Sequence, residues 1–185
     1  MIAALAQPTP ARTAFFERRE SNLLTEPLLF QGSLQRPSAE QLVKQIDGPP
    51  AESMQISADR VRVERDGERT RSFSLRRAPE LAVLAASFQA LLAGDRPQLE
   101  KLYQLQFSAE AGHWQLLLVP KEARLRKRVD QLRLHGSALA WHCLDLELAN
   151  GERSRMWLGE LAAAAAAASD EAARDRLCLA ASGDK

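Results

Sequence analysis

The stretch LLFQGSLQRPSAEQLVKQI, residues 28–46, decides how this chain folds. Leu28, Phe30 and Leu34 share one parity, so in an extended strand their side chains point to one face of a sheet. Arg36 has the same parity and follows the three apolar residues onto that face. A charged side chain on the apolar face of a sheet is unfavourable unless it is paired. Arg36 is therefore wrongly assigned to this face, or paired with a buried partner, or part of the protein's function.

Length and composition are those of an ordinary globular protein. The chain has 185 residues, 45% of them apolar and 26% charged, with a net charge of +1. This predicts one domain with at most a small appendage, and the charge implies no polyanionic partner. No apolar run approaches the roughly 18 residues that a membrane span requires.

The first ten residues, MIAALAQPTP, predict one or two helical turns ended by Pro8 and Pro10. They lack the basic region that begins a signal peptide. If the protein is exported, we expect that its signal peptide has been removed or lies upstream of this chain.

Alternating apolar and polar residues predict a mainly antiparallel sheet. Asp66-Gly67 and Asn150-Gly151 each separate two alternating segments, which is typical of a tight hairpin. The expected strands are residues 11–24, 28–36, 41–47, 60–65, 68–75, 102–108, 113–120, 129–136, 138–149 and 152–159.

Three segments have helical character. Pro79 begins a segment with apolar residues at helical spacing that ends at Gly94, and a short helix is expected directly after it. The alanine-rich residues 160–182 predict one C-terminal helix. Without regular βαβ alternation, the fold class is α+β with an antiparallel sheet, in a domain of residues 1–158 followed by a tail of residues 159–185.

The sequence carries no mark of an enzyme. It has no glycine-rich phosphate loop, no G-x-S-x-G elbow and no H-E-x-x-H. His113, His135 and His142 lie at expected turns or strand ends without a second ligand at metal spacing. We therefore expect no catalytic residue, no metal and no cofactor.

Two features leave alternatives open. The basic run KEARLRKRVDQLR, residues 121–133, is either a solvated face or a docking surface for anionic head groups or an acidic partner. Nucleic acid fits it less well, because aromatic residues do not interleave with the charges. Cys143 and Cys178 are compatible with one disulfide or with two reduced thiols.

The expected strands have an unusually large apolar face. This face is either a core covered by the helices or a binding surface. Its candidate members are Leu28, Phe30, Leu34, Leu42, Val61, Val63, Trp114, Leu116, Leu118, Leu132, Leu134, Leu139 and Trp141.

Four motifs, in order along residues 2–158, resemble those of the LolA-like periplasmic outer-membrane lipoprotein carriers. AFFERRES resembles the family's F-x-Q strand, and GSLQRPSAEQL resembles its segment with Gly, Leu and Arg-Pro. HWQLLLVPKEA resembles its strand ending in Leu-x-Pro-Lys, and VDQLRLHGSALAWHCLDLELANGERSRM resembles its next two strands with their hairpin. Glu17 and Leu42 depart from the family's usual glutamine and aromatic residue, which indicates a divergent branch.

The resemblance implies an incomplete, half-open β-barrel whose concave apolar face is covered by helices acting as a lid. Arg36 matches the family arginine that bonds to the lid backbone in the closed, empty state, so we expect it to act as a latch. The lipid-binding residues that the resemblance implies are Phe15, Leu28, Phe30, Leu34, Leu42, Val61, Val63, Leu84, Phe88, Trp114, Leu116, Leu118, Leu132, Leu134 and Trp141.

The implied function is non-enzymatic. We expect a monomeric periplasmic carrier of acylated lipoprotein or lipid cargo, with an inner-membrane donor complex, an outer-membrane acceptor, transient membrane contact and no nucleic acid. Two alternatives remain: a carrier of a non-protein lipid, such as a polyene or a glycolipid intermediate, and a closed interaction module.

Overall fold

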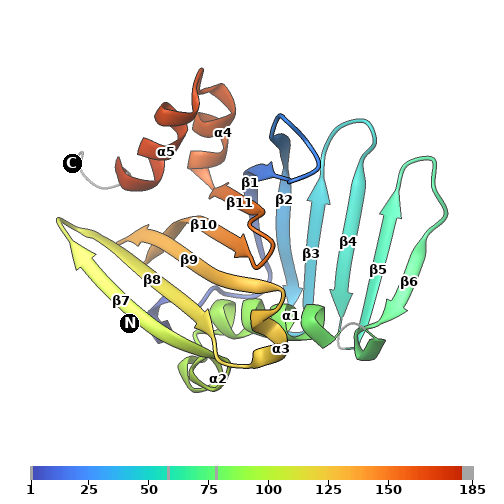
Figure 1. Cartoon of the computed structure of the whole chain (residues 1–185), viewed down its shortest axis with the longest axis horizontal. Coiled ribbons are helices and arrows are strands. Elements are labelled where there is room, and N and C mark those ends of the chain that lie inside the picture. The colour runs from blue at the N-terminus through green and yellow to red at the C-terminus, as the bar shows by residue number, and fades with distance from the viewer. Residues whose placement is uncertain (1, 58, 78, 181–185) are drawn as a thin grey trace. The chain divides into compact units, whose positions relative to one another are not determined.

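The computed structural model describes residues 2–57, 59–77 and 79–180. Its strands form one antiparallel sheet in the order β6-β5-β4-β3-β2-β1-β11-β10-β9-β8-β7, which is not closed because β6 and β7 are its two edges (Figure 1). The strands are β1 (Ala11–Glu20), β2 (Leu28–Ser38), β3 (Gln41–Ile46), β4 (Glu52–Ser57), β5 (Arg60–Arg65), β6 (Arg71–Ser74), β7 (Tyr103–Glu110), β8 (His113–Pro120), β9 (Val129–Ser137), β10 (Ala140–Leu148) and β11 (Arg153–Leu158).

The helices of the described chain are short. They are the 3₁₀-helices η1 (Ile2–Leu5) and η2 (Leu75–Arg77), and the α-helices α1 (Pro79–Ala93), α2 (Arg96–Leu102), α3 (Ala123–Arg126), α4 (Glu160–Ala167) and α5 (Glu171–Ala180). The predicted fold class, the hairpins at Asp66-Gly67 and Asn150-Gly151, and the helix beginning at Pro79 are confirmed.

The first strand and the C-terminal helix differ in extent from their prediction. The first strand ends at Glu20 rather than at residue 24, because Ser21 and the residues after it form a turn. The single C-terminal helix is two helices: Ala168 is extended, and the Asp170 carboxylate accepts a hydrogen bond from the Ala173 N–H at 2.7 Å. An aspartate that caps a helix N-terminus favours a new helix start over continuation of the alanine run.

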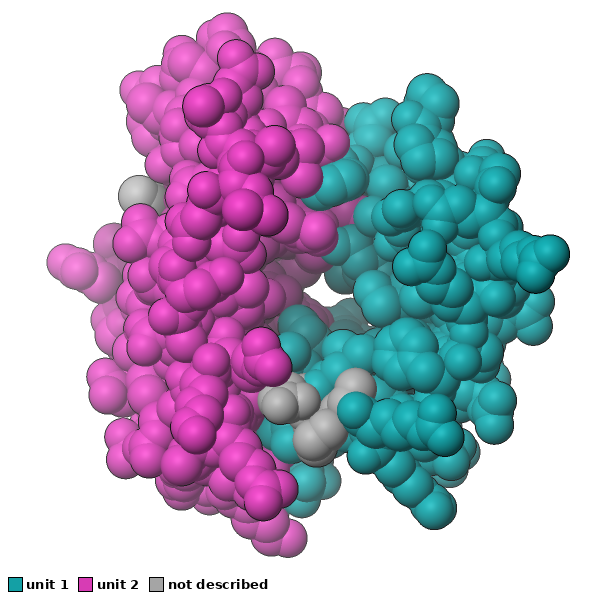
Figure 2. All heavy atoms as spheres, turned by 45° about the vertical axis from the view of Figure 1, so that its right-hand side comes forward, with its two compact units in different colours: residues 1–14, 30–99 teal, residues 15–29, 100–185 magenta. Residues whose placement is uncertain are grey.

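The chain folds into two compact units (Figure 2). Unit 1 comprises residues 1–14 and 30–99, and unit 2 comprises residues 15–29 and 100–185. Each unit contains its own part of the antiparallel sheet and its own helices.

In unit 1 the strand registers place the apolar residues on one face. Leu42, Ile56, Val61 and Phe73 are successive partners across β3 to β6, so they form one row. A second row contains Leu34, Lys44, Met54, Val63 and Arg71. The residues between these positions, such as Gln55 and Arg62, face the other way, and the alternation predicted for the β5 strand is confirmed.

Helix α1 runs along the strand ends of unit 1. The Gln89 Nε2 donates to the Glu40 carbonyl in the turn between β2 and β3 at 3.3 Å. Directly before α1, the Leu75 N–H donates to the Asp59 carbonyl between β4 and β5 at 2.6 Å. The helix thus lies beside the turns that border the apolar face.

In unit 2 the apolar face is a continuous set of rows. Phe107, Leu116, Leu134, Leu144 and Met156 are successive partners across β7 to β11. In the row beside them, Trp114 pairs with Gly136, and a Cβ on that glycine would lie 2.3 Å from the Trp114 ring. Glycine at residue 136 therefore lets the tryptophan lie flat across β9.

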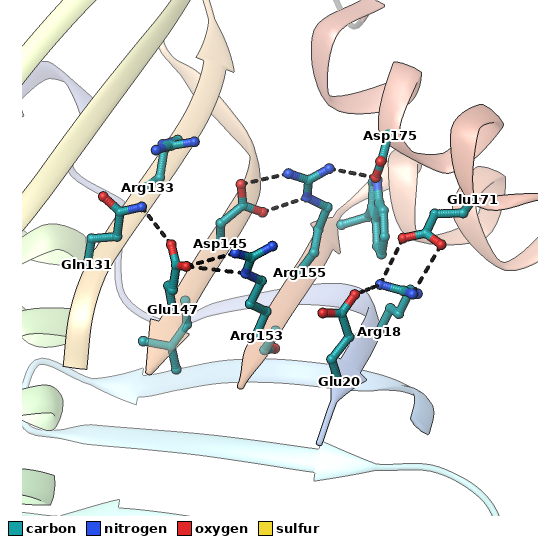
Figure 3. A pocket seen from close by; sticks show the side chains of 13 residues that line it. Arg18, Glu20, Gln131, Arg133, Asp145, Glu147, Arg153, Arg155, Glu171 and Asp175 are labelled. Atoms are coloured by element: carbon teal, nitrogen blue, oxygen red, sulfur yellow. Dashed lines mark hydrogen bonds and ion pairs between the residues drawn. The ribbon is translucent and has the colours of Figure 1, made fainter. Parts of the chain in front are cut away.

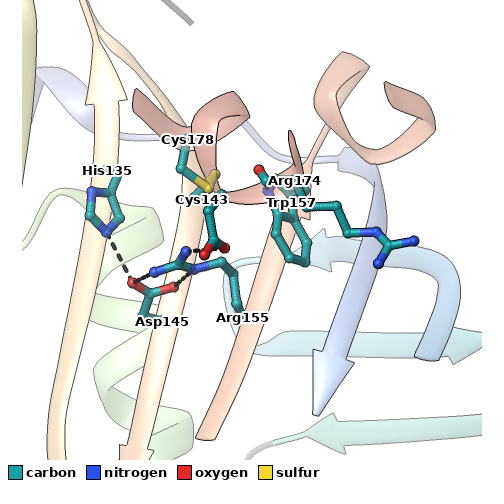
Figure 4. The surroundings of a disulfide bond; sticks show 8 residues. His135, Cys143, Asp145, Arg155, Trp157, Arg174 and Cys178 are labelled. Atoms are coloured by element: carbon teal, nitrogen blue, oxygen red, sulfur yellow. Dashed lines mark hydrogen bonds and ion pairs between the residues drawn. A yellow bond between two sulfur atoms is a disulfide. The ribbon is translucent and has the colours of Figure 1, made fainter. Parts of the chain in front are cut away.

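The opposite face of unit 2 carries the C-terminal helices (Figure 4). Cys143 on β10 and Cys178 on α5 form a disulfide, which decides between the two alternatives that the sequence left open. Trp157 donates from Nε1 to the Arg174 carbonyl at 3.0 Å, and the Arg174 guanidinium lies over the Phe16 ring. The alanine-rich segment is therefore attached to the sheet by a covalent bond and a buried aromatic pair.

Candidate functional site

Arg36 joins the apolar face of unit 1 to two helix ends. Its side chain is buried, with 7% of its surface exposed. Its Nη1 donates to the carbonyl oxygens of Gln7 at 2.9 Å and of Leu92 at 3.1 Å. Leu92 lies in the last turn of α1, where carbonyls lack partners within the helix, and Gln7 follows η1. A planar guanidinium with five donors suits this role, because it can bond to two carbonyls at once.

The backbone around Arg36 positions this contact. The register between β2 and β3 shifts after Gln35, near the end of β2. Arg36 is buried and the next residue, Pro37, is exposed, so the guanidinium lies close to the end of the strand. Helix α1 ends where Gly94 adopts a positive φ of 67°. The Leu92 carbonyl also accepts the Gln7 N–H at 2.8 Å, which ties the N-terminal segment to the same point.

Farther along β2, Gly32 fixes the distance to β3. A Cβ at this position would lie 1.9 Å from the Gln45 carbonyl oxygen, so no other residue fits without moving the backbone. The GSLQRP motif, residues 32–37, thus contains two residues with distinct structural roles. Gly32 is required by the close pairing of β2 with β3, and Arg36 bonds to the Gln7 and Leu92 carbonyls.

The apolar face of unit 1 is only partly covered. Leu34, Leu42 and Val63 are half-buried, and Val61 is buried. Phe30 is half-buried on β2, and α1 contributes Leu84 and Phe88, which are four residues apart and also half-buried. The structure therefore places these candidate residues within unit 1, with accessible apolar surface among them.

Three residues of this face were missed by the sequence analysis: Met54, Ile56 and Phe73. Met54 and Ile56 belong to β4, which we did not predict because residues 52–57 lie between a proline loop and a clear hairpin. The missed signal is the alternation of apolar and polar residues in ESMQIS. Phe73 ends the row at the edge strand with 36% of its surface exposed.

The candidate residues of unit 2 are mostly buried. Trp141 is half-buried, whereas Leu28 is 39% exposed at the beginning of β2. Leu139 was expected on the apolar face, but it lies in the turn between β9 and β10 with 61% of its surface exposed. The buried members are Phe15, Trp114, Leu116, Leu118, Leu132 and Leu134.

Glu17 is a charged residue on the apolar face of unit 2. It pairs with Met156 across β1 and β11, and only 2% of its surface is exposed. Its Oε1 accepts hydrogen bonds from Ser154 Oγ at 2.6 Å and from Arg19 Nη2 at 3.0 Å. These partners lie on β11 and β1, so Glu17 Oε1 is bonded within the sheet.

The opposite face of unit 2 contains a charged groove of about 350 Å³ beside α5 (Figure 3). The Asp145 carboxylate accepts both Nε and Nη2 of Arg155, at 2.6 and 2.9 Å, and bonds to His135 at 3.0 Å. Burial favours the neutral acid, but hydrogen bonds from His135 and Arg155 hold the pKa of Asp145 below its usual range. Asp145 is therefore held ionised and is poorly suited to act as a general acid.

The groove attaches α5 to the sheet. Arg155 also reaches Asp175 at 2.6 Å, and Arg18 reaches Glu171 at 2.9 Å (Figure 3). Both carboxylates belong to α5, whereas both arginines lie on strands. The ion pairs in this groove therefore support the same helix that the disulfide holds.

Among residues 2–57, 59–77 and 79–180, no group of three or more His, Cys, Asp or Glu side chains could hold a metal ion. None of the helices in these ranges is long and apolar enough to cross a lipid bilayer. In the basic run, Leu125 is buried while Arg124, Arg126 and Lys127 are exposed, so both interpretations of this run stay open.

An open antiparallel sheet with helices beside it is the architecture of LolA-like folds. The chain belongs to the family described as outer membrane lipoprotein carrier protein LolA-like, whose profile matches residues 1–181. Membership in this family indicates a lipid- or lipoprotein-binding carrier fold. No curated protein matches the chain.

Solved structures that are similar to this chain include a LolA superfamily protein and MucB. A LolA superfamily protein from Nitrosomonas europaea has 10% sequence identity and a TM-score of 0.41, over 86% of this chain and 89% of that one. MucB, solved in complex with the periplasmic part of MucA, has 18% identity and a TM-score of 0.33, over 85% of this chain. The similarity covers 53% of that MucB chain, so this chain spans about half its length.

Proposed function

We propose that this protein is a periplasmic carrier that shelters the acyl chains of a lipoprotein or lipid and ferries them towards the outer membrane. The observation that carries the proposal is the Arg36 contact. A buried guanidinium connects the strand end beside a partly exposed apolar face to the ends of η1 and α1. Acyl chains bind to this face of unit 1, and Arg36 is the latch that stabilises the empty form.

The energetics fit a reversible carrier. Each methylene removed from water contributes roughly 0.8 kcal/mol, so one long acyl chain gains on the order of 10 kcal/mol before costs. Breaking the bonds from Arg36 to Gln7 and Leu92 offsets part of this gain. Partial cancellation allows the cargo to be handed to an acceptor.

A second candidate is a carrier for a non-protein lipid, such as a polyene or a glycolipid intermediate. Leu42 favours this second candidate. It places an aliphatic side chain on the apolar face of unit 1, at a position where the LolA-like carriers usually have an aromatic residue. Both candidates use the same surface, and they differ only in the group that is attached to the apolar chain.

The test is extraction of lipid from protein purified out of its native host, followed by mass spectrometry. We expect an acyl-containing species, and an environment-sensitive apolar dye should bind with micromolar affinity and be displaced by long-chain fatty acid. Leu42→Ser should weaken dye binding, whereas Val43→Ser on the opposite face of the same strand should not. A native protein that yields no lipid and binds no dye would favour the closed interaction module.

A further inference from the structure

The segment between β1 and β2 exposes an unusual set of leucines. We call residues 21–29, SNLLTEPLL, the leucine loop; its last two residues are the first two of β2. Leu23 is 89% exposed, Leu24 50%, Leu28 39% and Leu29 51%. In the described part of the chain seven large apolar side chains are exposed, and four of them are in this loop. Single exposed leucines are common on protein surfaces, whereas four within seven residues of the chain are a local concentration of exposed apolar surface.

The loop is held in place by its base. Ser21 Oγ donates to Glu152 Oε1 at 2.8 Å, and the Asn22 N–H donates to the same oxygen at 3.2 Å. Asn22 Nδ2 also donates to the Asn150 carbonyl at 2.7 Å, in the turn between β10 and β11. The hydrogen bonds that Ser21 Oγ and the Asn22 N–H donate to the Glu152 carboxylate, led by that from Ser21, lower the pKa of Glu152. The polar residues of the loop thus bond back to unit 2 while the leucines point into solvent.

The size of the patch argues against a stable protein partner. Four leucine side chains cover on the order of 400 Å², within the range of ordinary surface patches. A stable protein interface buries roughly 800 Å² on each side. A lipid bilayer needs no matching surface, because its acyl region adapts to whatever apolar group enters it.

The charge of the loop also favours lipid. Glu26 is its only charged residue, so no cationic or anionic partner is selected by the loop itself. We propose, on the basis of the carrier function above, that the leucine loop inserts into the boundary between head groups and acyl chains of a bilayer and docks unit 2 there transiently. A single myristoyl chain binds membranes only marginally and reversibly, and four leucines of one loop act in the same regime. Reversible docking is what a carrier requires when it meets a membrane and leaves it.

The experiment is flotation of the full chain with vesicles of phosphatidylcholine, and with vesicles in which about a quarter of the lipid is phosphatidylglycerol. The parent should float with both. The double variant Leu23→Ser, Leu24→Ser should lower the partition coefficient by roughly tenfold or more. The matched control is Phe107→Ser, Leu139→Ser, which removes two exposed apolar side chains of unit 2 elsewhere and should change partitioning by less than about twofold.

Several results would overturn the proposal. The parent protein could float with neither kind of vesicle, or the Leu23→Ser, Leu24→Ser variant could float as well as the parent. The control variant Phe107→Ser, Leu139→Ser could also lose as much binding as the loop variant. Loss of parent binding in about 0.5 M salt, where charges are screened beyond roughly 4 Å, would mean that the basic run docks the protein instead. Dye binding by the same variants separates this proposal from the carrier function, because it should be unchanged in all of them.

Discussion

The two units present apolar sheet faces of different character. Along β8 of unit 2, residues alternate strictly between buried and half-buried, and Leu116 and Leu118 are almost inaccessible. Along β4 of unit 1, every residue is half-buried, including Met54 and Ile56 on the apolar face. The same antiparallel arrangement therefore serves as a closed core in unit 2 and as a partly accessible surface in unit 1.

Each apolar face carries a buried charged residue, Glu17 in unit 2 and Arg36 in unit 1, and the two differ in the kind of partner to which they bond. In unit 2, Glu17 Oε1 bonds to Ser154 and Arg19, which are side chains of the two strands β11 and β1. In unit 1, Arg36 bonds to the backbone carbonyls of Gln7, which follows η1, and of Leu92, in the last turn of α1. A charge that is bonded within one sheet stabilises that sheet. A charge that is bonded to separate helical segments stabilises the conformation in which those segments lie beside it, and its loss favours another conformation.

The largest expected effect tests the closed core against the accessible face. Leu132→Ala should lower the free energy of unfolding by roughly 3 to 5 kcal/mol, because a fully buried leucine leaves a cavity. Leu42→Ala, at a half-buried position, should cost about 1 to 2 kcal/mol and should weaken binding of an apolar dye. Urea denaturation and dye titration measure both. Equal destabilisation by the two variants would contradict the division between core and binding surface.

The contrast between the faces was only partly predictable from the sequence. Alternation and the Asp66-Gly67 and Asn150-Gly151 turns predicted most strands, because hairpin register is a local property. The sequence also placed Arg36 and Leu34 on one side of β2. It could not predict the degree of burial, since half-buried Leu42 and fully buried Leu132 have the same residue type and differ only in what covers them.

Glu17 and the helix-end partners of Arg36 lay beyond sequence reasoning for a similar reason. Ser154 is distant in sequence from Glu17 and meets it only through the pairing of β1 with β11. The resemblance implied that the arginine reaches lid backbone, but only the fold identifies Gln7 and Leu92 as the acceptors. Long-range partners follow from topology and not from local pattern.

The second effect concerns the helices on the other face of unit 2. Replacing Cys143 and Cys178 by alanine should lower the free energy of unfolding by about 3 to 4 kcal/mol, because the bridge closes a loop with a sequence separation of 35. Dye binding on the apolar face of unit 1 should be unchanged. The unfolded, unreduced parent should show no reactive thiol, and two thiols per chain would contradict the disulfide.

The third prediction tests Arg36 as a latch. Arg36→Leu keeps aliphatic bulk but leaves the Gln7 and Leu92 carbonyls without this donor, which should destabilise the empty form by about 1 to 3 kcal/mol. Weakening the empty form raises apparent cargo affinity, so the variant should load at least as well as the parent and release cargo more slowly. Arg36→Lys should be intermediate, because an ammonium cannot reproduce the planar fork. Lower stability with normal release would mean that Arg36 is structural only.

The smallest effect is expected where the charge is satisfied within the sheet. Glu17→Gln retains an acceptor for Ser154 Oγ and relieves the desolvation of a carboxylate that is 2% exposed. It removes the ion pair with Arg19, whose side chain is 43% exposed, and such pairs contribute little. The two changes oppose each other, so the free energy of unfolding should stay within about 1 kcal/mol of the parent value. Release of cargo should not change, in contrast to Arg36→Leu. Slower release from Glu17→Gln would show that a charge bonded within the sheet of unit 2 also affects the rate of cargo release. The proposed difference between Glu17 and Arg36 would then be wrong.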